Sequence, residues 1–246
     1  MNTRPFKTHT VTRTLPNKVY KNYRSYIPHL KKDFINRCAY CNLLDSLVTT
    51  SFEVDHFIPE EAFKGKNESL LTDYENLVYS CKKCNVAKSS QFEGDVYSSE
   101  KSNDLFYDPT KVDYSTIFFR NNIGIINSGN AKGRDMITRL KLYRPIYSLG
   151  WLCDQLVCLI EKLEEKINSA SDMKHIELYR EARRKLLEYY YSCNRVFTVS
   201  YNVEHLNNKD TGIDSSDTME LLDSISTSLA QVTDNTEDST RQEEVV

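Results

Sequence analysis

Apolar and polar positions alternate over short stretches in the first third of the chain. Residues 52–58 alternate until Pro59 ends the pattern, which predicts a short strand. Residues 76–80 have the composition of a second strand, and residues 85–90 that of the first turns of a helix. The polar stretch 60–75 between the strands is typical of a loop. The pattern therefore predicts strand, strand and helix in this order.

Shorter elements are predicted on both sides of this region. Residues 28–35 begin with proline, as the first turn of a helix often does. Residues 117–120 and 123–126 are two apolar runs separated by Asn-Asn, which favours a hairpin. Residues 131–143 are typical of a helix that is closed by Pro145.

Longer helical periodicity dominates the last part of the chain. Apolar residues recur at helical spacing over residues 148–168 and 172–193, and the short break at 168–171 predicts an antiparallel pair. Residues 207–246 lack aromatic side chains and are rich in polar residues, which predicts disorder. One amphipathic helix that docks on a partner is the alternative for part of this tail, on the spacing of Met219, Leu222, Ile225 and Leu229.

Charge is distributed unevenly, although the 246 residues have a formal net charge of only -3. Residues 1–37 hold nine lysines and arginines and one acid, whereas residues 204–246 hold eleven acids and two basic residues. A basic segment suits a phosphate backbone, and a solvated surface helix is an equally good interpretation. Three tyrosines interleave with the basic residues: Tyr20, Tyr23 and Tyr26.

Membrane spans and disulfides are not expected. No segment reaches the roughly 18 apolar residues of a membrane span, and residues 1–14 are polar and basic without an apolar stretch. Seven cysteines occur, but four form two close pairs and the others fall in apolar helical stretches. We therefore expect a reducing, cytoplasmic location.

The paired cysteines have the spacing of a structural zinc site. Cys38 and Cys41 form one C-x-x-C knuckle, and Cys81 and Cys84 form the other. Four thiolates in two knuckles complete a tetrahedral zinc site, which leaves no position for catalysis. The 39 residues between the knuckles exceed the roughly 15 to 20 of a plain zinc ribbon. We therefore expect this longer insertion to carry structure or functional residues beyond the zinc site.

That insertion carries residues suited to phosphodiester hydrolysis. The reaction needs a water nucleophile, a base that takes its proton and a divalent cation that stabilises the developing charge. A histidine that titrates near neutrality suits the base, and His56 follows Asp55 at the end of the first predicted strand. Carboxylate and amide oxygens suit Mg²⁺ or Mn²⁺, and Asn85 follows the second knuckle.

At these residues the sequence resembles the HNH endonuclease family, in its four-cysteine, McrA-like form. The matching elements occur in order: Arg37 to Cys41, Val54 to Pro59, Tyr74 to Leu77 and Cys81 to Lys88. The resemblance implies an α+β, treble-clef-like ββα-metal fold that is stabilised by structural Zn²⁺ on Cys38, Cys41, Cys81 and Cys84.

The resemblance also assigns roles within the site. His56 would be the general base, Asp55 and Asn85 the ligands of a catalytic Mg²⁺ or Mn²⁺, and Asn76 the brace of the loop that holds His56. Asn85 stands where the family's name-giving last histidine is expected. Lys88, one helical turn beyond Cys84, is expected to contact the scissile phosphate, with a solvated lysine as the alternative.

The resulting hypothesis is a metal-dependent DNA endonuclease. Its expected parts are a basic arm at 1–36, a nuclease core at 37–92, a hairpin with a helical domain at 93–206 and an acidic tail at 207–246. Residues 106–145 also resemble the segment after the core in some bacterial HNH proteins linked to phage defence, such as Septu components, which suggests a partner ATPase or another defence subunit. The alternative is a non-catalytic zinc-knuckle protein that binds nucleic acid or acts as an adaptor.

Overall fold

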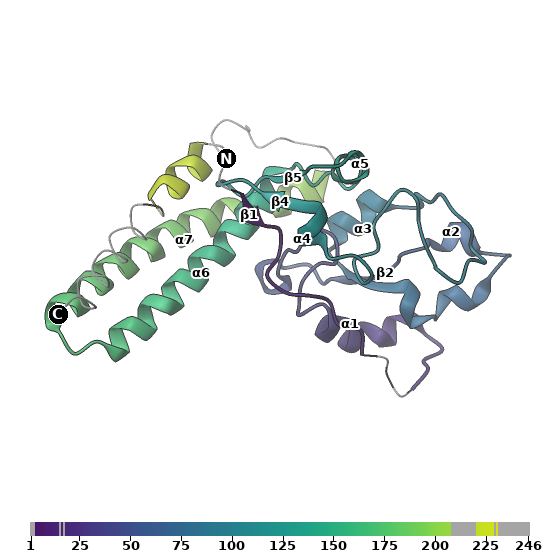
Figure 1. Ribbon diagram of the computed structural model, residues 1–246, viewed down its shortest axis with the longest axis horizontal. Helices are drawn as coiled ribbons and strands as arrows, with labels where there is room; N and C mark the ends of the chain where they lie inside the picture. The colour runs from purple at the N-terminus through teal and green to yellow at the C-terminus, as the bar shows by residue number, and fades with distance from the viewer. Residues whose placement is uncertain (1–2, 15, 17, 208–219, 229, 231–246) are drawn as a thin grey trace. The chain divides into compact units, whose positions relative to one another are not determined.

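The computed structural model of the chain describes residues 3–14, 16, 18–207, 220–228 and 230 (Figure 1). It forms two compact units. The first consists of the residues up to 121 together with 125–147, and the second of residues 122–124 together with those from 148 on.

A two-stranded hairpin and one helix form the centre of the first unit. Strands β2 (Glu53–His56) and β3 (Leu77–Ser80) pair antiparallel, so that His56 lies opposite Leu77. Helix α3 (Lys82–Lys88) follows at once and contacts β2. All four residues of β3 are buried, because the strand is covered on both faces. The predicted order of strand, strand and helix is confirmed.

The segment between the two strands was predicted as a loop, which is wrong. It contains α2 (Glu60–Phe63) and the 3₁₀ helices η3 (Glu68–Leu71) and η4 (Tyr74–Asn76). Phe63 and Leu70 are buried and hold these short turns against the core. Elements of three or four residues are too short to show a helical period in the sequence.

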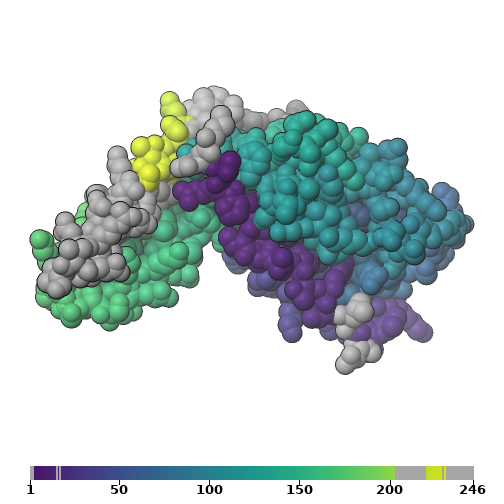
Figure 2. Space-filling view, in the orientation of Figure 1, coloured from purple at the N-terminus to yellow at the C-terminus, as the bar shows by residue number. Residues whose placement is uncertain are grey.

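The N-terminal segment packs against the rest of the first unit. It contains β1 (Arg4–Pro5), the 3₁₀ helix η1 (Tyr23–Tyr26) and α1 (Ile27–Asp33), and η2 (Asp45–Leu47) follows the first knuckle. In the space-filling view residues near the N-terminus, in purple, lie along the surface of this unit (Figure 2). The buried Asp33 carboxylate accepts hydrogen bonds from Thr14 and from the hydroxyl of Tyr74.

A second small sheet has the strand order β1-β4-β5. Helix α4 (Tyr114–Ile117) leads into β4 (Phe118–Arg120), which pairs with β5 (Ile126–Ser128), and α5 (Ala131–Arg139) follows. The hairpin was predicted with its second strand at 123–126. The observed strand begins at Ile126, because the chain first turns through Gly124, which has a φ of 83°.

Two long helices dominate the second unit. They are α6 (Pro145–Ser169) and α7 (Met173–Asn207). The pair was predicted, but α7 runs well past the expected end at residue 193. Pro145 begins α6, whereas α5 already ends at Arg139. Their buried residues include Leu149, Leu152, Leu156, Leu186, Cys193 and Phe197.

Part of the acidic tail is helical, contrary to the prediction of disorder. Residues 220–228 form this helix, Leu222 and Ile225 are buried, and the Ser226 hydroxyl donates to the carbonyl of Asn122. Met219 and Leu229, the other members of the expected stripe, lie outside the described residues. Among the helices that are described, none has the length and apolar character needed to cross a membrane.

Candidate active site and metal centre

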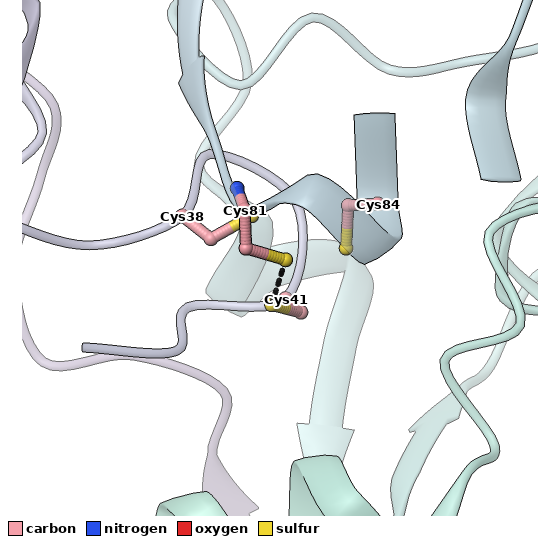
Figure 3. A group of neighbouring side chains, drawn as sticks. All are labelled: Cys38, Cys41, Cys81 and Cys84. Atoms are coloured by element: carbon pink, nitrogen blue, oxygen red, sulfur yellow. Dashed lines mark hydrogen bonds between the residues drawn. The ribbon is translucent and has the colours of Figure 1, made fainter. Parts of the chain in front are cut away.

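The four knuckle cysteines meet in one buried cluster (Figure 3). Cys38 and Cys41 lie in the turn after α1, and Cys81 and Cys84 lie at the start of α3. Their sulfur atoms all lie within 4.8 Å of one another, and those of Cys41 and Cys81 are 3.8 Å apart. Tetrahedral zinc with Zn–S bonds of about 2.3 Å separates its sulfurs by about 3.8 Å, so the cluster fits zinc.

The thiol chemistry of the cluster also calls for a cation. Burial raises the pKa of Cys41 and of Cys84 well above the usual thiol value. Burial opposes ionisation of Cys38 as well, but hydrogen bonds from the other three thiols outweigh it and lower that pKa. Four thiolates would repel one another in this buried cluster, and a bound divalent cation would offset that repulsion.

Two residues far along the chain support the knuckles. The Arg120 guanidinium, only 1% exposed, donates to the carbonyl of Cys41 at 3.2 Å and to the carbonyl of Tyr147 at 3.4 Å. The Tyr147 hydroxyl lies 3.6 Å from the sulfur of Cys84. A buried cation beside four thiolates offsets part of their negative charge.

His56 is held in one orientation by its neighbours. Its Nε2 lies 2.9 Å from the carbonyl oxygen of Leu71. A carbonyl only accepts, so Nε2 carries the proton and Nδ1 is the basic nitrogen of the neutral ring. The edge-on rings of Tyr23 and Phe63 pack at 4.7 Å and 5.7 Å from the imidazole.

Asn76 is fully buried and forms hydrogen bonds to two separate segments, the one that follows His56 and the one that ends at Leu71. Its Oδ1 accepts from the amide of Ile58 at 2.8 Å, and its Nδ2 donates to the carbonyls of Ile58 and Leu70 at 3.2 Å each. Its own carbonyl accepts from the amide of Phe57 at 2.8 Å. These bonds join the chain just after His56 to the turn that leads to Leu71.

Asp55 is occupied by two internal donors. The Tyr40 hydroxyl donates to Oδ2 at 2.5 Å, and the Lys88 ammonium donates to Oδ1 at 3.1 Å. Burial raises the pKa of Asp55 above its usual value, although Lys88 and Tyr40 oppose that shift. Each oxygen keeps a second lone pair, so the carboxylate can still bind a cation.

The structure places Lys88 differently from both expectations for it. Its side chain is fully buried, and its ammonium also donates to the carbonyl of His56 at 2.7 Å. The position one helical turn beyond Cys84 therefore faces β2, and its side chain points neither to solvent nor to a bound phosphate. Lys88 fixes the backbone of His56 and the carboxylate of Asp55 at once.

Asn85 is oriented by a residue that the sequence interpretation missed. Its Nδ2 donates to the carboxylate of Glu53 at 2.7 Å. A carboxylate only accepts, so the amide nitrogen must face Glu53, and Oδ1 has no hydrogen bond within the described part of the chain. Glu53 and Asp55 lie two positions apart on β2, on one face of the strand. The atoms that Asp55, Glu53 and Asn85 could offer to a metal are all oxygens, and oxygen ligands suit a hard divalent cation.

Residues 38–91 match the family model described as HNH endonuclease. The chain contains an HNH domain. No curated protein and no solved structure matches the sequence in the same comparisons. The match begins at the first knuckle and ends three residues after α3, so the HNH domain includes both knuckles, the β2–β3 hairpin and α3.

The HNH domain depends on contacts from outside its matched residues. Tyr23 packs on His56, and Arg120 and Tyr147 contact the knuckles, from positions before and after the domain. Within the domain, Tyr40 and Glu53 were also missed. Glu53 had a signal, because it shares a strand face with Asp55, whereas the contacts of the other four exist only in the folded chain.

Proposed function

We propose that the chain is a metal-dependent endonuclease that hydrolyses phosphodiester bonds of DNA. The observation that carries the proposal is the His56 ring. Its Nε2 is fixed on the carbonyl of Leu71, and its Nδ1 has no hydrogen bond within the described residues. A neutral imidazole held in one tautomer is what a general base for water requires.

The proposed reaction divides its tasks among the residues of the HNH domain. Nδ1 of His56 takes a proton from water, whose oxygen attacks phosphorus while the bond to the leaving oxygen breaks. Asn76 holds the turn that bonds His56, and Lys88 holds the backbone of His56 and the side chain of Asp55. Asp55 and Asn85 would hold Mg²⁺ or Mn²⁺, which supplies charge stabilisation at the phosphate.

The cysteine cluster has a structural role in this proposal. Zn²⁺ on the four thiolates fixes the turn before β2 and the start of α3, so the strand and the helix that carry the site keep a defined separation. Reduced thiols are required for this cation, which supports a cytoplasmic location.

A role in bacterial phage defence with a partner subunit is the biological setting that we propose. Its support is the sequence of residues 106–145, which resembles the segment after the core in such defence proteins. Phage plaque counts on cells that carry the gene in its natural neighbourhood, with and without His56→Ala, test this setting.

A non-catalytic nucleic-acid-binding or adaptor protein is the second candidate. The observation in its favour is that both oxygens of Asp55 already accept internal hydrogen bonds. In that case Lys88 and Asp55 would serve stability alone. Binding of DNA without cleavage under any divalent cation would support it.

Purified protein with supercoiled plasmid decides between the two candidates. We expect nicked or linear DNA with Mg²⁺ or Mn²⁺ and none with a chelator. His56→Ala should lower the cleavage rate by about 10²- to 10⁴-fold with zinc content and DNA binding unchanged. Cleavage by the His56→Ala protein at the wild-type rate would exclude His56 as the base.

A further inference from the structure

Tyr23 and Arg24 lie at the catalytic histidine although they precede the HNH domain in the sequence. The Tyr23 ring meets the His56 ring edge-on, with centroids 4.7 Å apart and an interplanar angle of 63°. The exposed Arg24 guanidinium lies 5.7 Å from the centroid of the Tyr23 ring. An aromatic ring thus separates an arginine from the proposed general base.

The turn that carries these residues is fixed by its own hydrogen bonds. The Asn22 side chain accepts from the amide of Arg24 at 3.0 Å and begins η1. Tyr26, at its end, is only 2% exposed, packs 5.1 Å from the ring of Tyr74 and accepts from the amide of Tyr20 at 3.0 Å. Because both ends of η1 are anchored, the place of Tyr23 against His56 does not depend on a mobile arm.

The two side chains offer complementary chemistry to a nucleic-acid strand. A guanidinium binds phosphate through two parallel hydrogen bonds, and contact with an aromatic face restricts its rotation beforehand. The Tyr23 hydroxyl has no hydrogen bond within the described residues, although the side chain is half-buried. The ring itself limits rotation of the His56 imidazole, together with the contact from Phe63.

We propose that Tyr23 and Arg24 complete the active centre: Tyr23 as a positioning residue for His56, and Arg24 as a contact to a phosphate of the bound strand beside the scissile bond. The proposal rests on the nuclease function proposed above. It assigns part of the catalytic apparatus to a segment that the family model does not cover.

The Tyr23 arm of the test compares Tyr23→Ala with Tyr23→Phe. Loss of the ring should lower kcat by about tenfold or more while KM changes little, because the base is misplaced and binding is not. Tyr23→Phe keeps the ring and should retain kcat within about twofold. An equal loss of kcat in both variants would overturn the positioning role, because it would not depend on the ring. Wild-type kcat in Tyr23→Ala would overturn it as well.

The Arg24 arm compares Arg24→Ala with Lys32→Ala, which removes the same charge from an exposed position on α1. DNA binding is measured in chelator at several salt concentrations, so cleavage does not interfere. Arg24→Ala should weaken binding at low salt and reduce the slope of log affinity against log salt by about one, with a smaller change in Lys32→Ala. Equal effects of the two variants would overturn the phosphate contact.

Failure of the nuclease function would be recognised separately. If wild-type protein cleaves nothing with Mg²⁺ or Mn²⁺, the proposed function fails, but the binding arm still decides the role of Arg24. The Tyr23 contact is then decided by the His56 imidazole signals in NMR spectra, identified with His56→Ala. They should keep their positions in Tyr23→Phe and shift or broaden in Tyr23→Ala, and unchanged signals in both would contradict the contact.

Discussion

Lys88 and Asp55 form an ion pair that solvent hardly reaches, with side-chain exposures of 0% and 7%. Two charges out of water lose hydration, and their attraction and additional hydrogen bonds must offset that loss. Tyr40 and the carbonyl of His56 supply such bonds. Removal of one partner leaves the other charge buried and unpaired, so the pair is sensitive to single substitutions.

We therefore expect Lys88→Met to destabilise the zinc-loaded protein by about 3 to 5 kcal/mol. Urea unfolding measures the effect, and Lys82→Met, at a partly exposed position on the same helix, is the matched control. The double variant Lys88→Met with Asp55→Asn should recover part of the loss, because no isolated carboxylate remains. Equal stability of the two methionine variants would argue against a structural role for the buried pair.

In the proposed cation site, Glu53 would act through Asn85, whose amide it orients. Without the Glu53 carboxylate, the Asn85 amide is free to rotate and Oδ1 loses its fixed direction. We expect Glu53→Ala to raise the Mn²⁺ concentration for half-maximal cleavage by about tenfold, a typical effect for residues that orient metal ligands. Glu53→Gln keeps an oxygen that can accept from the Asn85 amide, so it should raise this Mn²⁺ concentration less.

Binding of Mn²⁺ measured by electron paramagnetic resonance gives the same comparison without cleavage. The control is Glu60→Ala, because Glu60 is 46% exposed and pairs with Lys64 at the surface. An identical Mn²⁺ requirement in Glu53→Ala and wild type would remove Glu53 from the site.

The residues that could be predicted from the sequence are those whose chemistry is local. The cysteine pairs, Asp55 beside His56, and Asn85 are recognisable because spacing and residue type suggest a task, whereas the expected bracing role of Asn76 came from the resemblance to the HNH family. The roles of Tyr40, Tyr23 and Arg120 depend on which distant segments meet. Lys88 was found at the right position, but its direction could not be known until α3 was seen against β2.

At the scale of elements, periodic patterns of sufficient length were the reliable signal. The β2–β3 hairpin and the helices α6 and α7 were predicted because each repeats its pattern over a strand length or several turns. The short elements α2, η3 and η4 give no such repeat. Pro145 was interpreted as the end of a helix, but proline is also common in the first turn of a helix, and Pro145 begins α6.

The knuckle cluster and the β1-β4-β5 sheet meet through Arg120, which extends from β4 to the carbonyl of Cys41. We expect Arg120→Ala to weaken zinc binding by about tenfold, since a buried positive charge and two hydrogen bonds are lost. Competition with a chromogenic chelator measures this, with Arg134→Ala on the exposed face of α5 as control.

Tyr147→Phe gives a milder version of the same test if Arg120→Ala does not fold. It removes only the hydroxyl beside the sulfur of Cys84. Wild-type protein should contain one zinc per chain, and Cys81→Ala should lose solubility together with the metal. A folded wild-type protein with less than about half an equivalent of zinc would contradict the structural site.

At the scale of the whole molecule, the basic N-terminal segment contains residues that hold the fold and other residues that are exposed and free to meet the proposed DNA substrate. Phe6 is buried, and the Arg13 guanidinium donates to the carbonyls of Tyr74 and Glu75, so this part holds the fold. Other basic residues remain exposed, among them Lys21, Arg24 and Lys32. A deletion of the segment would therefore mix loss of stability with loss of the proposed DNA contacts.

We expect the two tasks to separate experimentally. Deletion of residues 1–14 should lower the free energy of unfolding, because it removes Phe6 and the bonds of Arg13. Replacement of Lys21, Arg24 and Lys32 by serine should leave stability within about 0.5 kcal/mol for each change and weaken DNA binding. Affinity titrations at several salt concentrations should give a flatter slope. An unchanged slope would place the DNA-binding surface elsewhere.

The spacing of the knuckles has a consequence for the order in which the chain folds. Zinc joins Cys41 to Cys81 across 39 residues, and the β2–β3 hairpin closes the same loop, with Glu53 opposite Ser80. Closure of a loop has an entropic cost that needs to be met only once, so whichever forms first makes the other easier. Zinc binding and strand pairing should therefore assist each other, so a newly synthesised chain that meets zinc should complete the hairpin more readily than one that does not.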